Sequence, residues 1–346
     1  MRVCMVTKFP PIQGGIAAKS YWLARGLGET GTEVHVVTNA GCVEPEYRIT
    51  GCEEHLKNLP NVHVHDLAKE VSWHVPFSKA YAERLLDLVL RTVEENQCQV
   101  VDSGFLMPYG LVAFLANRIS GIPYVVRHGG SDLAKFLHHP EFSRLMNLAI
   151  TNASAIVTDN DHADYLRGIN QRVVVIPSYV PDHRYFKPTL RKRGARPVVL
   201  YLGKINYYWQ NKRLLELLGE VLGRFPDVHL VFVAQGNGID RFKRNIGEQL
   251  LRRIKFRPFV PPWEVPSLLS GVDYVMLARD EVVPSASNVE QEAVACGREL
   301  IALSVENAQE SADSPGRAAQ SYTYERWIQD NLAALKSCIS GRDVLH

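Results

Sequence analysis

The chain has 346 residues, which is more than one small core holds and fits two domains of about 150 residues each. Lys and Arg number 39 against 37 Asp and Glu, so the formal charge of +2 gives no reason to expect a nucleic-acid partner. No stretch approaches the ~20 apolar residues of a membrane-spanning helix, and the first apolar run breaks at Lys8, too early for a secretion signal.

The six cysteines are scattered and form neither a C-x-x-C pair nor a metal-ligand spacing with histidine. This usage is typical of a reducing compartment, so we expect a cytoplasmic protein. A peripheral contact with the inner face of the membrane stays open, as does the oligomeric state.

The first half of the chain alternates strand and helix patterns. A strand over 2–7, a loop ending at Gly14-Gly15, a helix over 16–27 and a strand over 33–38 are typical of the start of a parallel sheet. Further strands are predicted at 62–67, 100–101, 123–126, 155–158 and 173–176, and further helices at 81–95, near 111–118 and from 161. Two glycines at a strand-to-helix turn open the backbone amides to a ligand, although the spacing is not that of a dinucleotide-binding fingerprint.

A titratable cluster follows the strand predicted over 123–126. His128, two glycines and Asp132 stand at its carboxyl end, the edge where open α/β sheets place their sites. A lone histidine is more often structural, but this combination favours a functional His128. We expect His128 and the Gly14-Gly15 loop to line one cleft, because each follows the carboxyl end of a parallel strand.

The second half restarts the alternation after a proline-punctuated linker. Strands are predicted at 197–202, 229–233, 254–259 and 274–278, and helices over 211–224, 263–269, 287–297 and 324–338. The first of these strands ends at Gly203-Lys204, and Lys212 lies at the start of the following helix. We place the domain boundary near residues 185–196.

The helix between Ser287 and Gly297 carries the most complete local signal. Ser287 can cap its first amides, Glu290 can complete a capping box, and Gly297 supplies the stop. At such an end, a phosphate can accept hydrogen bonds from the free N–H groups and is attracted by the positive end of the helix dipole. Glu292 lies about one and a half turns further on, at a depth suited to a ribose hydroxyl pair. The alternative is an ordinary core helix with a good cap.

These motifs, in this order, resemble glycosyltransferase family four, the retaining nucleotide-sugar enzymes. The matching segments are GGIA at 14–17, HGGSD at 128–132, IPSYVPDHRYF at 176–186, YLGK at 201–204 with Lys212, FVPPWEVPSLLSGVDYVML at 259–277 and EAVACG at 292–297. The resemblance implies an α/β protein of the GT-B fold, with two Rossmann-like domains facing across a cleft. It divides the chain into an acceptor-side domain over 1–185, a donor domain over 186–322 and a closing helix over 323–346 that packs back on the first domain.

The resemblance also implies roles for individual residues. Lys204 and Lys212 would stabilise the departing diphosphate, while His128 would orient the donor sugar or the acceptor at the reacting carbon. The expected donor-binding residues are Gly14, Gly15, Lys204, Lys212, Ser285, Ser287, Asn288 and Glu292, and Asp132 is expected on the acceptor side. No aspartate-rich metal site is visible, so we expect no metal and no cofactor beyond the nucleotide-sugar substrate.

Two departures from the family pattern keep alternatives open. Pro284 stands where the family has a glutamate, eight positions before Glu292, and Ser285-Ala286-Ser287 replaces its usual glycine turn. The missing glutamate makes a catalytically silent nucleotide-sugar binder one alternative, and a non-hydrolysing sugar-nucleotide epimerase is another. The sequence specifies neither the base nor the sugar, nor whether the acceptor is a sugar, a lipid-linked molecule or another small molecule.

Overall fold

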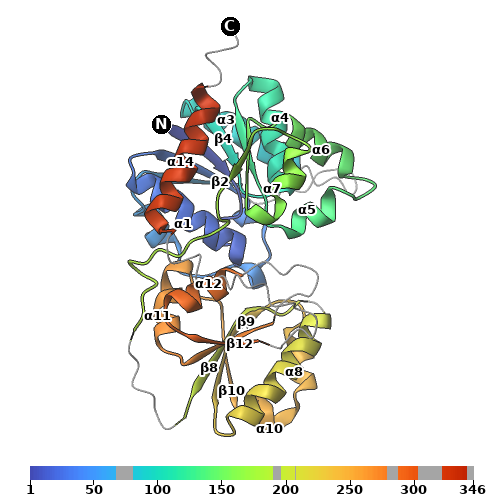
Figure 1. The fold of residues 1–346 in the computed structure, drawn as a ribbon, viewed down its shortest axis with the longest axis vertical. Coiled ribbons are helices and arrows are strands. Elements are labelled where there is room, and N and C mark those ends of the chain that lie inside the picture. Colours follow the sequence, from blue (N-terminus) through green and yellow to red (C-terminus); the bar gives the residue numbers. More distant parts are fainter. Residues whose placement is uncertain (68–80, 190–195, 207, 279–286, 303–321, 341–346) are drawn as a thin grey trace.

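The computed structural model describes residues 1–67, 81–189, 196–206, 208–278, 287–302 and 322–340. Two parallel sheets, one in each half of the chain, form the cores of the two lobes seen in Figure 1. The first sheet ends at Val175 and the second begins at Val198, and the domain boundaries near 185 and 322 stay predictions.

The first sheet has seven strands in the order β3-β2-β1-β4-β5-β6-β7, all paired in parallel. The strands are β1 Arg2–Val6, β2 Glu33–Thr38, β3 Val62–Asp66, β4 Val100–Ser103, β5 Tyr124–Arg127, β6 Ala155–Thr158 and β7 Val173–Val175. Strands β4, β5 and β6 are buried along their whole length, as expected for strands covered on both faces.

The helices of the first half include three that the sequence did not predict. They are α1 Gly15–Glu29, α2 Glu53–Lys57, α3 Tyr81–Glu95, α4 Leu111–Ser120, α5 Ser131–Phe136, α6 Ser143–Thr151 and α7 Asn160–Arg167, with short turns η1 Ala40–Cys42, η2 Pro45–Tyr47 and η3 Leu106–Gly110. Helices α2, α5 and α6 are short. They contribute few buried apolar residues each, so they leave a weak periodic signal.

The second sheet has five parallel strands in the order β10-β9-β8-β11-β12. Its elements are β8 Val198–Lys204, α8 Tyr208–Arg224, β9 His229–Gln235, α9 Ile239–Asn245, α10 Gly247–Leu251, β10 Ile254–Arg257, η4 Pro262–Glu264, α11 Val265–Ser270, β11 Tyr274–Leu277, α12 Asn288–Ala295 and β12 Glu299–Ala302. The prediction ended the sheet at residues 274–278 and missed β12. This edge strand has four residues, of which Ile301 alone is buried, and its apolar stretch, Leu300 to Ala302, is too short to give a clear strand pattern.

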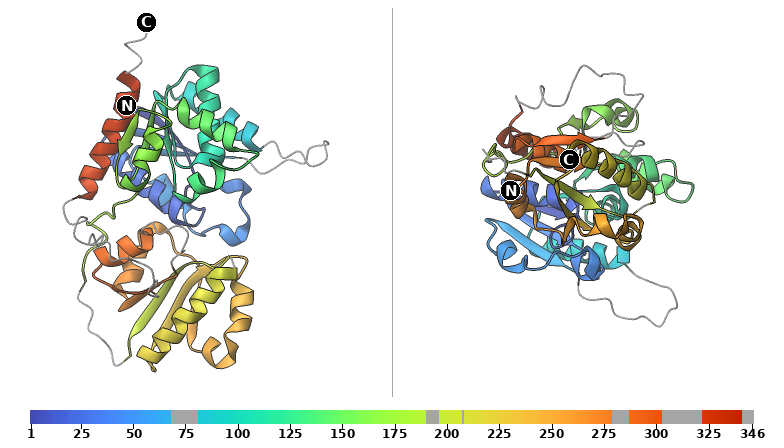
Figure 2. Two further views of the ribbon diagram at one scale, coloured as in Figure 1. Left: turned by 45° about the vertical axis from the view of Figure 1, so that its right-hand side comes forward. Right: turned by 90° about the horizontal axis from the view of Figure 1, so that it is seen from below.

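The last helix, α14 Tyr324–Ser340, lies against the first half of the chain, beside α1 in Figures 1 and 2. The Tyr324 hydroxyl donates to the Trp22 carbonyl at 2.7 Å, and Trp327 Nε1 donates to the Pro177 carbonyl at 2.8 Å. A Cβ on Gly26 would lie 2.2 Å from the Ile328 side chain, so glycine permits this close approach. In the described ranges, no helix combines the length and apolarity needed to cross a bilayer.

Candidate active site

A cavity of about 270 Å³ lies between the two lobes, and we call it the interdomain pocket. On the first lobe it is lined by Lys8 and by residues 12–18, which form the end of the loop after β1 and the start of α1. On the second lobe it is formed by the end of β8 and the start of α12, together with Glu292. The pocket thus lies where the carboxyl ends of parallel strands from both sheets meet, the edge at which such sheets bind ligands.

The Gly14-Gly15 turn is approached by side chains of the other lobe. Gly14 has a φ of +115°, and a Cβ there would lie 3.1 Å from Lys204 Nζ. Asn288 Nδ2, at the start of α12, donates to the Gly15 carbonyl at 2.9 Å. The glycines therefore keep the turn open, as the sequence predicts, and the groups nearest to them are Lys204 and Asn288.

Two lysines carry the positive charge of the interdomain pocket. Lys204 ends β8, and burial, together with the nearby charge of Lys8, lowers its pKa to about 8. Lys8 directly follows β1 and its turn, and burial lowers its pKa as well. In the described part of the chain, no carboxylate lies within 4.0 Å of either ammonium group. Two desolvated cations without a paired carboxylate favour an anionic ligand.

Lys8 was not among the predicted site residues. Its signal in the sequence is its place just beyond the carboxyl end of a buried strand, the same signal that identified His128.

Helix α12 begins as its sequence predicts, and Ser287 Oγ accepts a hydrogen bond from the Glu290 amide at 3.2 Å. Glu292 lines the pocket but is buried, and the Tyr179 hydroxyl donates to its Oε1 at 3.0 Å. Burial raises the pKa of Glu292 to about 8, so the carboxyl is mostly protonated at neutral pH. The charged ribose acceptor that the sequence suggests is therefore a neutral carboxyl held by Tyr179, a partner the sequence analysis missed.

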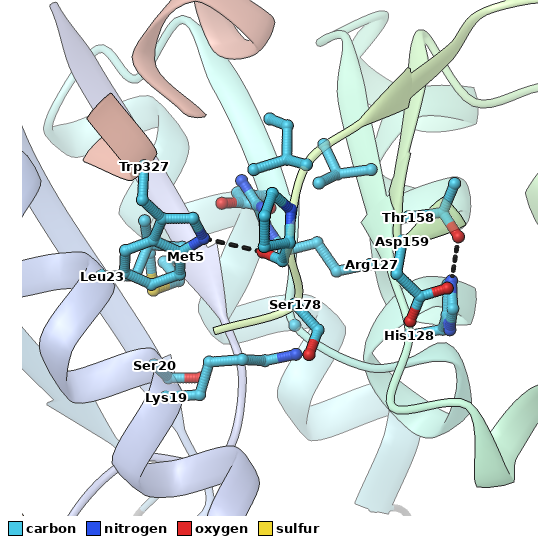
Figure 3. Close-up of a pocket in the computed structure, with 15 residues that line it drawn as sticks. Met5, Lys19, Ser20, Leu23, Arg127, His128, Thr158, Asp159, Ser178 and Trp327 are labelled. Carbon is cyan, nitrogen blue, oxygen red and sulfur yellow. Dashed lines mark hydrogen bonds and ion pairs between the residues drawn. The ribbon is translucent and has the colours of Figure 1, made fainter. Parts of the chain in front are cut away.

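His128 lines a different and much smaller cavity, of about 20 Å³, which has room for about one water molecule (Figure 3). The Gly130 amide donates to His128 Nδ1 at 3.1 Å, so Nε2 carries the proton and donates to Thr158 Oγ1 at 2.6 Å. Burial lowers the pKa of His128 to about 3. No residue is common to the linings of the two cavities.

The expectation that His128 and Gly14-Gly15 line one cleft is therefore wrong in this structure. Both follow strand ends of the same sheet, but the imidazole points to β6, where Nε2 meets Thr158, and the Gly130 amide in the turn after β5 satisfies Nδ1. Its role toward the donor sugar or the acceptor stays a prediction.

The small cavity is built around a buried ionic network. Arg127 Nε donates to Asp102 Oδ1 at 2.7 Å, and Arg127 Nη1 donates to Asn331 Oδ1 of α14 at 2.5 Å. Lys19, on α1, points toward Ser178 in Figure 3, and burial lowers its pKa to about 8. Sequence reasoning missed Lys19, although a lysine amid the apolar residues of the first helix is a visible signal.

Asp132 reaches neither cavity. Its Oδ1 accepts from the Gly129 amide at 2.8 Å and the Leu133 amide at 3.2 Å, and its Oδ2 accepts from the Leu106 amide at 2.9 Å. The carboxyl group is completely buried. Asp132 therefore holds the glycine turn to η3, and its expected place on the acceptor side stays a prediction.

Lys212 also lies outside the interdomain pocket. It sits in the first turns of α8, its side chain is 72% exposed, and its Nζ lies 3.8 Å from Glu216 on the same helix. Of the two lysines predicted to act together, the structure brings only Lys204 to the cavity. Ser285, expected to bind the donor, and Pro284 lie outside the described residues.

Comparison with known proteins places this geometry in a family context. Residues 14–178 match the model described as Glycosyl transferase 4-like domain, and no curated protein matches the chain. Sucrose-phosphate synthase from Thermosynechococcus elongatus superimposes with a TM-score of 0.61 at 15% identity, covering 100% of this chain and 98% of that one. HepE from Anabaena, in complex with UDP and glucose, gives 0.60 at 16% identity, covering 100% and 94%.

A further similar structure is the UDP-GlcNAc 2-epimerase from Methanocaldococcus jannaschii, with a TM-score of 0.56 at 14% identity, covering 100% of this chain and 99% of that one. Identities this low establish a shared fold only. The chain therefore has the GT-B fold, and residues 14–178 match the glycosyl transferase 4-like model, in agreement with the resemblance that its motifs indicated.

Proposed function

We propose that the protein is a retaining glycosyltransferase, which moves a sugar from a nucleoside diphosphate sugar to an acceptor hydroxyl without a metal ion. The observation that carries this proposal is the pair of half-buried lysines, Lys8 and Lys204, in a cavity where two sheet ends and the α12 N-terminus meet. A diphosphate would supply the negative charge that these lysines lack.

The chemistry follows from this charge distribution. Departure of the nucleoside diphosphate breaks the bond between the anomeric carbon and the phosphate oxygen and leaves the electron pair on that oxygen. Lys204, Lys8 and the free amides of α12 would stabilise the developing charge. The acceptor hydroxyl would bond to the same face of the carbon, and the departing phosphate would take its proton, which retains the anomeric configuration.

A covalent intermediate would need a second carboxylate close to the reacting carbon. Within the described ranges, Glu292 is the single carboxyl group that lines the interdomain pocket. This supports a mechanism in which the departing phosphate itself serves as the base. Asn288 and Glu292 would then hold the sugar and the ribose from the α12 side.

One observation favours a second candidate. Two of the similar structures are UDP-GlcNAc 2-epimerases, and this chain shares their fold over 98–100% of its length. An epimerase turns over its nucleotide sugar without any acceptor. Conversion of UDP-GlcNAc in the absence of an acceptor would therefore favour this candidate over the transferase.

The proposal is tested by ligand binding and then by turnover. We would measure the thermal stability of the full chain with uridine, guanosine, adenosine and thymidine diphosphates, because a ligand that binds only the folded state raises stability. UDP is the first probe, since the similar HepE structure holds UDP. The nucleotide that stabilises the protein defines the donor series to be assayed against sugar, lipid-linked and small-molecule acceptors, with the product's anomeric configuration read by NMR.

Stabilisation by one diphosphate and its sugars, with acceptor-dependent release of the diphosphate and retained configuration, is the expected result. Stabilisation without turnover over the whole panel would support a silent binder, while no stabilisation by any diphosphate would contradict the assignment of the pocket.

A further inference from the structure

A cluster of histidines lies on the first sheet, away from the interdomain pocket. Glu33 and His35 come from the start of β2, and His63 and His65 come from the edge strand β3. His35 pairs with His63 in the parallel register, and alternate residues of a strand share a face, so all four side chains lie on one face. The rings of His63 and His65 stack on His35, with centroids 5.0 and 5.3 Å away.

Three of these side chains converge on one point. His35 Nε2 lies 3.2 Å from Glu33 Oε1, and His63 Nε2 lies 3.9 Å from the same oxygen. One ligand atom from each of the three residues lies within 4.8 Å of the others. A tetrahedral Zn²⁺ with bonds of about 2.0–2.1 Å would hold its ligands about 3.3 Å apart. Rotation of His63, which is 54% exposed, can close the remaining gap.

The other polar atoms of two of these groups are held by neighbours. His35 Nδ1 shares a hydrogen bond with His65 Nε2 at 3.1 Å, and Arg2 Nε donates to Glu33 Oε2 at 3.1 Å. Metal sites in proteins use such outer partners to orient the ligating imidazole and carboxylate. Here they leave His35 Nε2 and Glu33 Oε1 directed at the shared point.

A second group, His128 with Asp159 and His162, also brings three ligand atoms within 4.8 Å of one another. Both ring nitrogens of His128 are already used, by the Gly130 amide and by Thr158. This histidine can give a lone pair to a metal only by losing a hydrogen bond. In the β2–β3 cluster, His35 Nε2 is hydrogen-bonded to Glu33 Oε1, but this bond joins two of the ligands themselves, so a metal ion can take the place of its proton.

We propose that Glu33, His35 and His63 bind a zinc ion, with a water molecule in the fourth position. Two imidazoles and one carboxylate are a ligand set that Zn²⁺ accepts. The ion would tie the edge strand β3 to β2 at the amino ends of the strands, while the interdomain pocket lies at the carboxyl ends. The site would thus lie apart from the interdomain pocket and hold the strand pair together, with no part in sugar transfer.

Zinc titration of the full chain tests this proposal, with tag-free protein freed of metal by a chelator. Isothermal titration should show one ion bound per chain, and a 100-fold excess over the dissociation constant should raise the melting temperature by roughly 5 °C or more. His63→Ala and Glu33→Gln should each weaken binding by about 100-fold or more, and Arg2→Gln by roughly tenfold, because it removes an outer partner.

His183→Ala is the matched control. His183 is exposed and lies 3.6 Å from Glu325, so this variant removes a histidine beside a glutamate where the structure shows no third ligand among the described residues. It should bind zinc like the unchanged protein. Circular dichroism of each variant verifies folding, and Co²⁺ absorption that zinc abolishes gives a second measure of the site.

Three results would overturn the proposal. They are failure of the unchanged protein to bind zinc, equal binding by His63→Ala and His183→Ala, and loss of binding in His162→Ala with retention in His63→Ala. The last of these would place the metal beside His128.

Discussion

The protein contains two polar regions that differ in how their charges are satisfied. In the small cavity, Arg127 is paired with Asp102 and Asn331, and His128 has a partner at each ring nitrogen. In the interdomain pocket, Lys8 and Lys204 have no carboxylate within 4.0 Å among the described residues, and the volume is about 270 Å³ against about 20 Å³. Paired charges without space indicate structure, whereas unpaired charges with space indicate a ligand.

Two atoms of the small cavity qualify this contrast. Asp102 Oδ2 and Arg127 Nη2 are buried and lack a hydrogen-bond partner in the described part of the chain. A cavity of about 20 Å³ beside them has the size for one bridging water molecule. The cavity is too small for a sugar or a phosphate.

The largest expected effect is on stability, in the small cavity. Arg127→Met leaves Asp102 buried without its cation, which typically costs about 3–5 kcal/mol of unfolding free energy. Denaturant unfolding of the full chain measures this loss. Arg167→Met is the matched control: it breaks an Arg–Asp pair of the same 2.7 Å length that is exposed, and should cost under about 1 kcal/mol. Equal losses of unfolding free energy in the two variants would contradict the expected difference between the buried and the exposed pair.

The next effect is on turnover, in the interdomain pocket. Lys204→Ala should lower the rate of sugar transfer by roughly two powers of ten or more, because a preorganised charge on the leaving diphosphate is lost. Lys212→Ala serves as the control, since its exposed side chain pairs with Glu216 on α8. A steady-state assay with saturating acceptor compares the two. If Lys212→Ala lowers the rate as much as Lys204→Ala does, the two lysines act together, as the sequence motif predicts.

Glu292 makes the protein sensitive to pH. Its pKa is about 8 in the folded chain, above the ordinary value of 4.5. The protonated carboxyl therefore contributes its full stabilisation of the folded state below pH 4.5. That stability is lost as the pH rises through about 8. Glu292→Gln keeps the neutral shape and should be more stable than the unchanged protein at pH 8–9, with little difference at pH 4.5. Melting curves over this range measure the effect, and parallel curves for the two proteins would contradict it.

The same substitution revises an expectation about nucleotide binding. If Glu292 were a charged ribose acceptor, Glu292→Gln would weaken binding by about one to two powers of ten. Because the buried carboxyl is mostly neutral at pH 7, we expect a change of less than about threefold there. The affinity of both proteins for the nucleoside diphosphate, measured by titration at pH 7, distinguishes the two outcomes.

The smallest effect is on the choice of donor sugar. Asn288→Ala removes the contact from α12 to the Gly15 carbonyl, at the edge of the pocket. It should change the order of preference among donor sugars while binding of the free diphosphate stays nearly intact. Competition assays with a series of sugar conjugates measure this order. Equal losses for the diphosphate and every conjugate would show that this end of α12 holds phosphate only.

Local patterns in the sequence determined most of the fold. The alternation of apolar strands and amphipathic helices, the Gly14-Gly15 turn and the Ser287 cap all depend on residues within a few positions of one another. The closing helix was predicted for the same reason, because its apolar face repeats at helical spacing. The elements missed, such as β12 and α6, are short and bury few apolar side chains.

The tertiary structure alone decided which polar groups meet and which are already satisfied. Lys8 and Lys204 come from different sheets, Tyr179 reaches Glu292 from the other half of the chain, and His128 turns to Thr158 on a neighbouring strand. His35 and His63 meet only through the parallel register of β2 and β3. Such contacts depend on strand order and lobe packing, which no short window of sequence encodes, and they set the burial and the partners on which each group's charge depends.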